Sequence, residues 1–224
     1  MSDNIVYLLY QTTIRLVVLL TALPFHEFAH AWAANKMGDS TARYQGRLTL
    51  NPLAHLDPLG SLLMLFAGFG WAKPVPINPR NFKNPKKGMA LSAAAGPLSN
   101  LLLAYLGMVL WKVVLYLQYP FGDSFLIESL SDIFRLIVLL NLGLAVFNLL
   151  PVPPLDGSRL FTVFLPPRQY FQIMQYERYI QLALFVAIFM GLLDRPLAFV
   201  EGYVFQGLNF LTGYIDWIAQ ALLG

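Results

Sequence analysis

Two histidines and a glutamate form the pattern His26-Glu27-x-x-His30. On an α-helix, residues four apart project from one face about one turn apart, so both imidazoles can reach one metal ion. Glu27 lies beside them, where its carboxylate can act as general base on a water activated by the metal. Five residues can match by chance, so the weight of this pattern depends on its place in the chain.

The pattern ends a stretch that is typical of a membrane helix. Ile5 to Phe25 carries one charge, Arg15, over about the 20 residues that a bilayer requires. Ionisable groups at such a depth are costly and are functional candidates by default. Arg15 is three turns from His26, and we expect it to snorkel outward or to pair with a polar neighbour.

Composition limits the class of protein. The 224 residues are 57% hydrophobic and only 12% charged, with no cysteine and a net charge of +3. A soluble domain carries about 25% charged residues, so we expect one multi-pass domain, residues 1–224, in the cell membrane, in contact with lipid. Without thiolates, a metal must be held by His, Asp or Glu. The modest charge predicts no nucleic-acid partner, and the N-terminus predicts no cleaved signal peptide.

Apolar runs predict an α-helical polytopic protein with about five transmembrane helices, or six. Three runs are long enough to span, one is short, and the last is either a span or an interfacial helix: Ile5–Phe25, Met89–Trp111, Leu136–Leu155, Tyr179–Leu193 and Gly202–Ile215.

Charge indicates that Pro58–Trp71 is a re-entrant segment. Its apolar length gives about 20 Å of helix, short of a bilayer core of about 30 Å. Eight of the fifteen Lys and Arg residues lie between Lys36 and Lys87, on both sides of this run. The positive-inside rule places such loops in the cytoplasm, and a re-entrant segment keeps all eight there. The same topology brings Asp156 to the membrane face of His26, so the site is expected near the cytoplasmic face.

Two short stretches are expected to be β-strands that line a cavity near this face. Tyr44–Leu50 alternates loosely, and the prolines of Lys73–Asn78 exclude a helix.

Asp156 is the best candidate for a third metal ligand. Pro151, Pro153 and Pro154 unwind the chain before it, and we expect Gly157 to permit an unusual backbone turn. The alternative is an ordinary turn or helix-capping aspartate, because Asp-Gly is a common turn pair.

Three motifs now stand in order along the chain: His26-Glu27-x-x-His30, Gly96-Pro97-Leu98-Ser99-Asn100, and Asn148 followed by prolines and Leu155-Asp156-Gly157. Together they resemble the site-2 protease family of intramembrane zinc metalloproteases. The resemblance covers a catalytic core of about residues 5–165, with C-terminal helices over about 177–222 outside it. It is to the compact bacterial members, which have no PDZ or nucleotide-sensing domain.

The resemblance implies a role for each matched residue. Zn²⁺ would be bound by His26, His30 and Asp156, with Glu27 as catalytic base and proton shuttle. Asn148 would hold the substrate or the developing oxyanion, which suits a neutral amide donor.

Other polar residues near the motifs have structural interpretations. The element from Gly96 to Asn100 would pack the second long helix against the site, with Ser99 in helix–helix hydrogen bonding. His55 is interpreted as a turn histidine bonded to Asp57 or to backbone. A fourth metal ligand or a transition-state donor is the alternative for His55.

The sequence therefore predicts an intramembrane metalloendopeptidase that cleaves transmembrane segments of membrane-anchored proteins, in regulated proteolysis or in removal of signal-peptide remnants. An unwound substrate could pair with an enzyme edge strand at Tyr44–Leu50 or Lys73–Asn78. The rival interpretations are a small transporter or channel, whose polar groups would form an ion pathway, and an inactive family member that acts as an adaptor.

Overall fold

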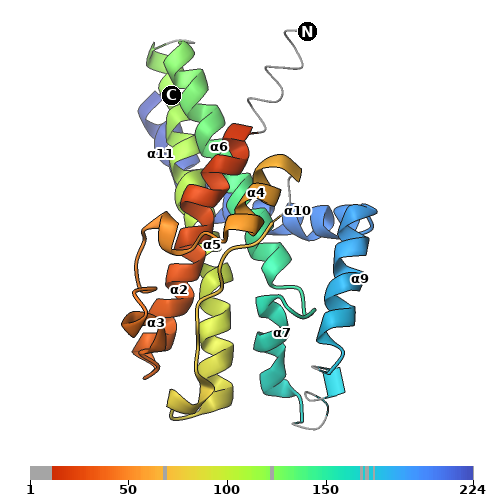
Figure 1. The fold of residues 1–224 in the computed structure, drawn as a ribbon. Coiled ribbons are helices and arrows are strands. Elements are labelled where there is room, and N and C mark those ends of the chain that lie inside the picture. Colours follow the sequence, from red (N-terminus) through yellow and green to blue (C-terminus); the bar gives the residue numbers. More distant parts are fainter. Residues whose placement is uncertain are drawn as a thin grey trace. The chain divides into compact units, whose positions relative to one another are not determined.

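The protein is described by a computed structural model that covers residues 12–67, 70–121, 124–166, 169, 172–173 and 175–223. Its contacts divide the chain into two compact units, Met1–Ser99 with Leu149–Ile180 and Asn100–Asn148 with Gln181–Gly224. The helices are labelled in Figure 1. The single domain expected from the sequence stays a prediction.

Within the described residues, three helices are long and apolar enough to cross a membrane, Thr12–Lys36, Pro85–Gln118 and Phe125–Asn148. The protein is therefore a membrane protein, as expected, and these helices match the first three apolar runs of the sequence. The part of the first run before residue 12 lies outside the described residues.

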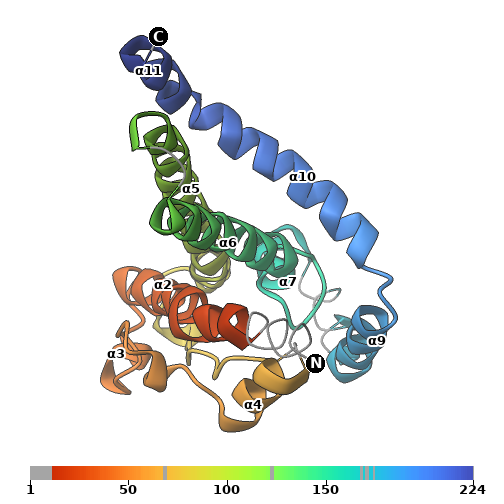
Figure 2. The same cartoon turned by 90° about the horizontal axis from the view of Figure 1, so that it is seen from above.

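The C-terminal half supports fewer spans than the sequence suggested. α9, Glu177–Phe189, and α10, Asp194–Leu211, make one further candidate span only if taken together, and they meet at 84°. Figure 2 shows α9 nearly end-on and α10 lengthwise. The run expected at 202–215 is divided between α10 and α11, Gly213–Leu223. About five spans thus become three or four, because short or bent helices do not reach across a bilayer.

A change of helical pitch precedes the metal-binding pattern in the first unit. A π-helical stretch, Val18–Ala22, leads into α2, Leu23–Lys36, whose second residue is Pro24. Proline lacks an amide hydrogen and clashes with the carbonyl four residues earlier, so the chain widens before it.

Small residues bring α2 against the first part of α5, Pro85–Phe121. Figure 1 shows the two helices side by side, and Ala31, Ala34, Ala90 and Ala93 are buried. Alanines allow close approach of two helices in a membrane. Ser99 Oγ donates to its own helix at Gly96 O, 2.7 Å away, and lies 3.5 Å from Phe25 O of α2.

The chain between α2 and α5 contains short helices and, within the described residues, no β-strand. The helices are α3, Thr41–Tyr44; the 3₁₀ turn η2, Pro52–Ala54; α4, Pro58–Ala67; and the 3₁₀ turn η3, Pro79–Asn81.

The strand predicted at 44–50 is therefore wrong. Tyr44 ends α3, Gly46 has a φ of 68°, and the Arg47 amide turns back to Ala42 O at 2.8 Å. A left-handed residue in the middle of this stretch breaks an extended run. The strand predicted at 73–78 is also wrong: these residues contain no helix or turn, and Asn78 is extended, but no strand is assigned there. Prolines 74 and 76 cannot donate to a ladder.

The two ends of α4 return to one place, which supports a re-entrant segment. Leu56 and Ala72 form an antiparallel bridge, and a side chain on Gly60 would lie 2.2 Å from Trp71 O. The ten-residue helix is about 15 Å long at about 1.5 Å per residue, too short to span. Arg15 donates to the carbonyl of Leu65 in the last turn of α4, and so it pairs with a polar neighbour, as one alternative predicted.

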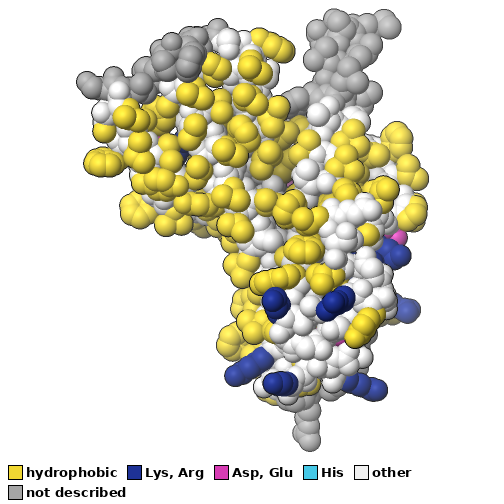
Figure 3. All heavy atoms as spheres, turned by 90° about the vertical axis from the view of Figure 1, so that its left-hand side faces the viewer, with side chains coloured by type: hydrophobic (Ala, Val, Ile, Leu, Met, Phe, Trp, Pro, Cys, Tyr) yellow, Lys and Arg dark blue, Asp and Glu magenta, His cyan; other side chains and the backbone are white. Residues whose placement is uncertain are grey.

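Basic side chains gather at one end of the face drawn in Figure 3, with hydrophobic side chains over much of the remaining surface. Seven basic residues between α2 and α5 are exposed: Lys36, Arg43, Lys73, Arg80, Lys83, Lys86 and Lys87. Arg47, the eighth, is buried and donates to Lys73 O.

The second unit is built from the rest of α5, α6 (Phe125–Asn148), α10 and α11. An apolar cluster from three of these helices forms its core: Ala104, Met108, Val138, Leu142, Val146 and Leu208. Lys112 is buried and pairs with Asp216 of α11. α6 ends at Asn148, seven residues before the end of the predicted run, because proline follows at 151.

Labelling of single cysteines tests the re-entrant path. The chain has no native cysteine, and we expect Lys36→Cys and Lys83→Cys to react with an impermeant maleimide from the same side, which the charge distribution predicts to be cytoplasmic. Glu128→Cys, in the first turn of the helix Phe125–Asn148, should react from the other side. Asp123, in the loop that is expected on that side, lies outside the described residues. Labelling of Lys36→Cys and Lys83→Cys from opposite sides would make 58–71 a full span.

Candidate metal centre

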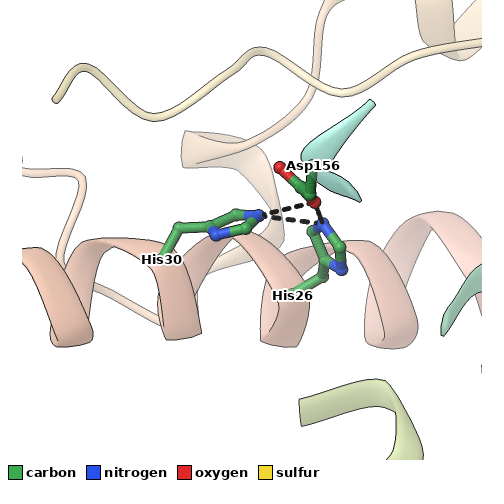
Figure 4. Close-up of side chains that lie close together, drawn as sticks. All are labelled: His26, His30 and Asp156. Carbon is green, nitrogen blue, oxygen red and sulfur yellow. Dashed lines mark hydrogen bonds and ion pairs between the residues drawn. The ribbon is translucent and has the colours of Figure 1, made fainter. Parts of the chain in front are cut away.

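Two imidazoles and one carboxylate converge in the first unit. His26 and His30 lie one turn apart on α2, and their Nε2 atoms are 3.0 Å apart. Asp156 Oδ2 is 3.0 Å from His26 Nε2 and 3.1 Å from His30 Nε2. Figure 4 shows the three side chains pointing toward one another. The predicted convergence of residues 130 positions apart is thus present in the structure.

Asp156 reaches the histidines from the start of α7, Asp156–Phe161, which leads into the 3₁₀ turn η4, Thr162–Phe164. The Leu155 amide donates to Val152 O, so a turn precedes the helix. Asp156 is at the N-terminus of a helix, as the structural alternative supposed, but its carboxylate is bonded to the histidines.

Gly157 is required because it has no side chain and so leaves room for neighbouring backbone, and not because it forms an unusual turn. It has no positive φ, so the expected backbone role is wrong. A Cβ atom there would lie 2.2 Å from Leu149 O and 2.4 Å from Leu150 O. Glycine is needed because the backbone of Leu149 and Leu150 passes directly beside it.

α5 orients His30 and leaves room for both rings. His30 Nδ1 lies 2.6 Å from the carbonyl oxygen of Ser92. A carbonyl can only accept, so Nδ1 carries a proton, and whenever the ring is neutral Nε2 presents its lone pair to the site. A Cβ atom on Gly96 would lie 2.4 Å from His30 Nε2 and 2.6 Å from His26 Cε1. The Gly96 element therefore packs against the site, as expected.

The three atoms suit a metal ion by chemistry and spacing. Each presents a lone pair or a negative charge, and such atoms repel unless a proton or a cation lies between them. Ligand atoms about 2.0 to 2.2 Å from a tetrahedral zinc ion are about 3.4 Å apart, close to the spacing found here. The group contains two histidines and one carboxylate, a combination that catalytic zinc sites use.

Asp156 is held in its charged form. Burial opposes ionisation, but hydrogen bonds and charge attraction from His26 and His30 outweigh it, and the pKa of Asp156 lies well below its usual value. An ionised carboxylate is the form that binds metal.

Glu27 is buried beside the three ligating groups and is not one of them. Its Oε2 accepts a hydrogen bond of 3.0 Å from the backbone amide of Val75. The position next to the group, outside the ligand set, is the one that a general base requires.

Two other predicted residues do not join the group. His55 is fully buried, its Nε2 donates to Thr49 O at 2.7 Å, and its carbonyl accepts from the Lys73 amide. His55 thus holds two loops together through hydrogen bonds with backbone atoms, and not through Asp57. This agrees with its interpretation as a structural turn histidine. Asn148 ends α6 in the second unit, where its Nδ2 donates to Leu144 O at 2.9 Å. Its role in catalysis stays a prediction.

Asp39, which the sequence analysis did not select, organises the loops near the site. Its Oδ2 accepts from the Asn78 amide at 2.7 Å, and its Oδ1 accepts from Thr41 and from Asn81 Nδ2. Burial would raise its pKa, but these hydrogen bonds lower it overall. The Gly-Asp-Ser-Thr sequence after α2 is a capping signal that could have identified it.

A cavity of about 500 Å³ lies in the first unit, and one of its lining residues, Val75, donates a hydrogen bond to Glu27. One wall is formed by residues 74–77 and Met89, and another by Pro154 and Ser158, two residues before and two after Asp156. Such a volume fits a short stretch of peptide.

Comparison with known proteins agrees with these features. Residues 113–193, which contain Asn148 and Asp156, match the model of Peptidase family M50. "Putative zinc metalloprotease YwhC" of Bacillus subtilis is 46% identical over 166 residues, 73% of this chain and 74% of that protein. "Putative zinc metalloprotease Rip2" of Mycolicibacterium smegmatis is 32% identical over 70% of this chain and 60% of its own length.

An archaeal relative, "Putative zinc metalloprotease MJ0611" of Methanocaldococcus jannaschii, is 29% identical over 65% of this chain and 68% of its own length. No solved structure matches the chain. The convergence of two histidines and an aspartate in a membrane protein, the Gly96 element that makes room for them, and this similarity lead to one conclusion: the chain belongs to peptidase family M50, the site-2 proteases.

Proposed function

We propose that this protein is a zinc endopeptidase that cleaves membrane-anchored proteins within or next to a transmembrane segment. The observation that carries the proposal is the mutual contact of His26, His30 and Asp156 at 3.0 to 3.1 Å in a chain with three candidate membrane spans. His26, His30 and Asp156 would hold the zinc. When bound, zinc polarises a carbonyl group and makes a water molecule more acidic.

Glu27 performs the proton transfers in this proposal. One carboxylate oxygen is bonded to the Val75 amide, and the other is available to take a proton from the attacking water. The same carboxyl group then gives the proton to the amide nitrogen that leaves when the peptide bond breaks.

The extended residues 73–78 are the proposed contact for the unwound substrate. Backbone hydrogen bonds shield the peptide bonds of a helix, so the substrate must be extended where it is cut. Residues 74–77 line the cavity beside Asp156, and the Ile77 amide has no hydrogen-bond partner among the described residues. With the strand at 44–50 excluded, this edge is the remaining candidate for β-augmentation.

The site is proposed to lie near the cytoplasmic face of a bacterial cell membrane. The basic residues next to α2 and α5 support this orientation under the positive-inside rule. Asn148 is proposed to hold the substrate or the developing oxyanion, since its Nδ2 has a second hydrogen to donate.

Replacement of the three proposed ligands tests the metal site. Purified wild-type protein should contain about one zinc per chain, and His26→Ala, His30→Ala and Asp156→Ala should each lose most of it, because zinc needs three protein ligands here. Metal analysis by mass spectrometry gives the content. An Asp156→Ala variant that keeps both zinc and activity would show that another group is the third ligand.

Glu27→Gln separates catalysis from metal binding. The amide keeps the size of the side chain and a carbonyl oxygen for the Val75 amide, but it cannot take up a proton. We expect normal zinc content and a fall in kcat of about 10²- to 10⁴-fold. Cleavage of a labelled single-span peptide in proteoliposomes measures it. Unchanged turnover of Glu27→Gln would contradict the role of Glu27. A wild-type protein that binds zinc but does not cleave the peptide would favour the interpretation as an inactive family member that acts as an adaptor.

Gly96→Ala tests whether α5 must leave room for the imidazoles. The added methyl would lie 2.4 Å from His30 Nε2 and would displace the ring, so zinc affinity should fall about 10- to 100-fold, the usual effect of disturbing a ligand's support. Gly202→Ala is the matched control, because nothing lies within 4 Å of its added atom. Equal zinc affinity of the two variants would mean that α5 does not pack against the site as described.

A further inference from the structure

Residues 73–78 are fixed to the rest of the first unit by polar contacts at three places. The Lys73 amide donates to His55 O at 2.8 Å, the Val75 amide to Glu27 Oε2 at 3.0 Å, and the Asn78 amide to Asp39 Oδ2 at 2.7 Å. Two of these acceptors are carboxylates. The first and last contacts fix the ends of the segment, whereas the middle one reaches the proposed base.

The Val75–Glu27 contact is buried on both sides. Val75 is 8% exposed and Glu27 is 9% exposed, and the Val75 side chain packs against Ala31 and Ala42. A hydrogen bond to a carboxylate is shorter and stronger than a neutral one, most of all away from water. Since Val75 is anchored by its own packing, its amide is a fixed donor for a side chain that otherwise rotates about three bonds.

We infer that the Val75 amide is a positioning group for Glu27: it holds Oε2 and thereby turns Oε1 toward the reacting atoms. This inference rests on the proposed function, because it assigns a partner to the proposed base. Glu27 Oε1 has no hydrogen-bond partner among the described residues, so it is the oxygen that can exchange a proton.

The same segment also lines the cavity beside Asp156. A peptide that lies along residues 74–77 would therefore contact the segment that orients the base. Reacting groups must be placed to within a fraction of an ångström for efficient catalysis, and one rigid segment that contacts both provides this.

The flanking prolines make a selective test possible. Pro76 already restricts Val75 to an extended conformation, which proline also adopts, so Val75→Pro removes the amide hydrogen with little change in the path of the chain. Val75→Thr is the matched control, because it keeps the amide and the branched shape. Both are measured with a labelled single-span peptide in proteoliposomes.

We expect Val75→Pro to keep its zinc and its KM while kcat falls about 10- to 100-fold, the mark of an interaction used in the transition state. Val75→Thr should lose much less. A segment that only supported the fold would instead lower zinc content or raise KM. Equal kcat values for Val75→Pro and Val75→Thr would overturn the inference.

Hydrogen exchange provides a second measurement that does not depend on activity or on folding of the proline variant. In zinc-free protein, a peptide that covers 73–78 contains no amide hydrogen at positions 74 and 76, so few sites contribute to its exchange. Glu27→Ala removes the acceptor and should speed exchange at one amide, whereas Glu27→Gln keeps an acceptor and should not. Equal exchange in the two variants would overturn the inference.

The two hypotheses fail in different ways. A wild-type protein that neither binds zinc nor cleaves peptide contradicts the proposed function. A wild-type protein that cleaves, together with a Val75→Pro variant as active as Val75→Thr, contradicts only the role of Val75.

Discussion

The first unit depends on three electron-rich atoms that are forced together: His26 Nε2, His30 Nε2 and Asp156 Oδ2, all within 3.1 Å. Without a cation, the repulsion among these three atoms could be relieved only by one or two protons that lie between them. A divalent ion would satisfy all three at once, and its positive charge would offset the negative charge of Asp156. Charge neutrality matters because the histidines lie on a candidate membrane span, where an unbalanced charge is costly.

The surrounding chain supplies room and orientation for these atoms. Glycines stand at two close approaches, Gly96 against the imidazoles and Gly157 against the backbone of Leu149 and Leu150. The Ser92 carbonyl selects the tautomer of His30. Gly96, Gly157 and Ser92 are not candidate ligands, but each restricts the position or orientation of a candidate ligand side chain. This explains why a five-residue pattern needs partners spread over more than a hundred positions.

The sequence predicted the convergence of His26, His30 and Asp156 and the first three candidate spans, because these follow from helix periodicity, apolar length and charge. The roles of these residues as ligands and the re-entrant path of 58–71 stay predictions. The sequence wrongly predicted a strand at 44–50, where the left-handed Gly46 breaks an extended run, and it did not predict the bend between α9 and α10. It also missed Val75 and Asp39. A backbone amide has no signature in the sequence, and an aspartate after a helix resembles any other cap. The roles of Val75 and Asp39 depend on contacts between segments that are far apart in the sequence.

Irregular backbone beside a membrane helix has a further cost, because each amide and carbonyl needs a partner. Here charged side chains act as these partners: Arg15 for the end of α4, Arg47 for Lys73, Asp39 for Asn78 and Glu27 for Val75. Glu27 therefore satisfies a structural requirement and is also the proposed base. A buried carboxylate that accepts a hydrogen bond from a backbone amide is held in place. The requirement that keeps the extended segment stable thus also prepares the residue that would move the proton.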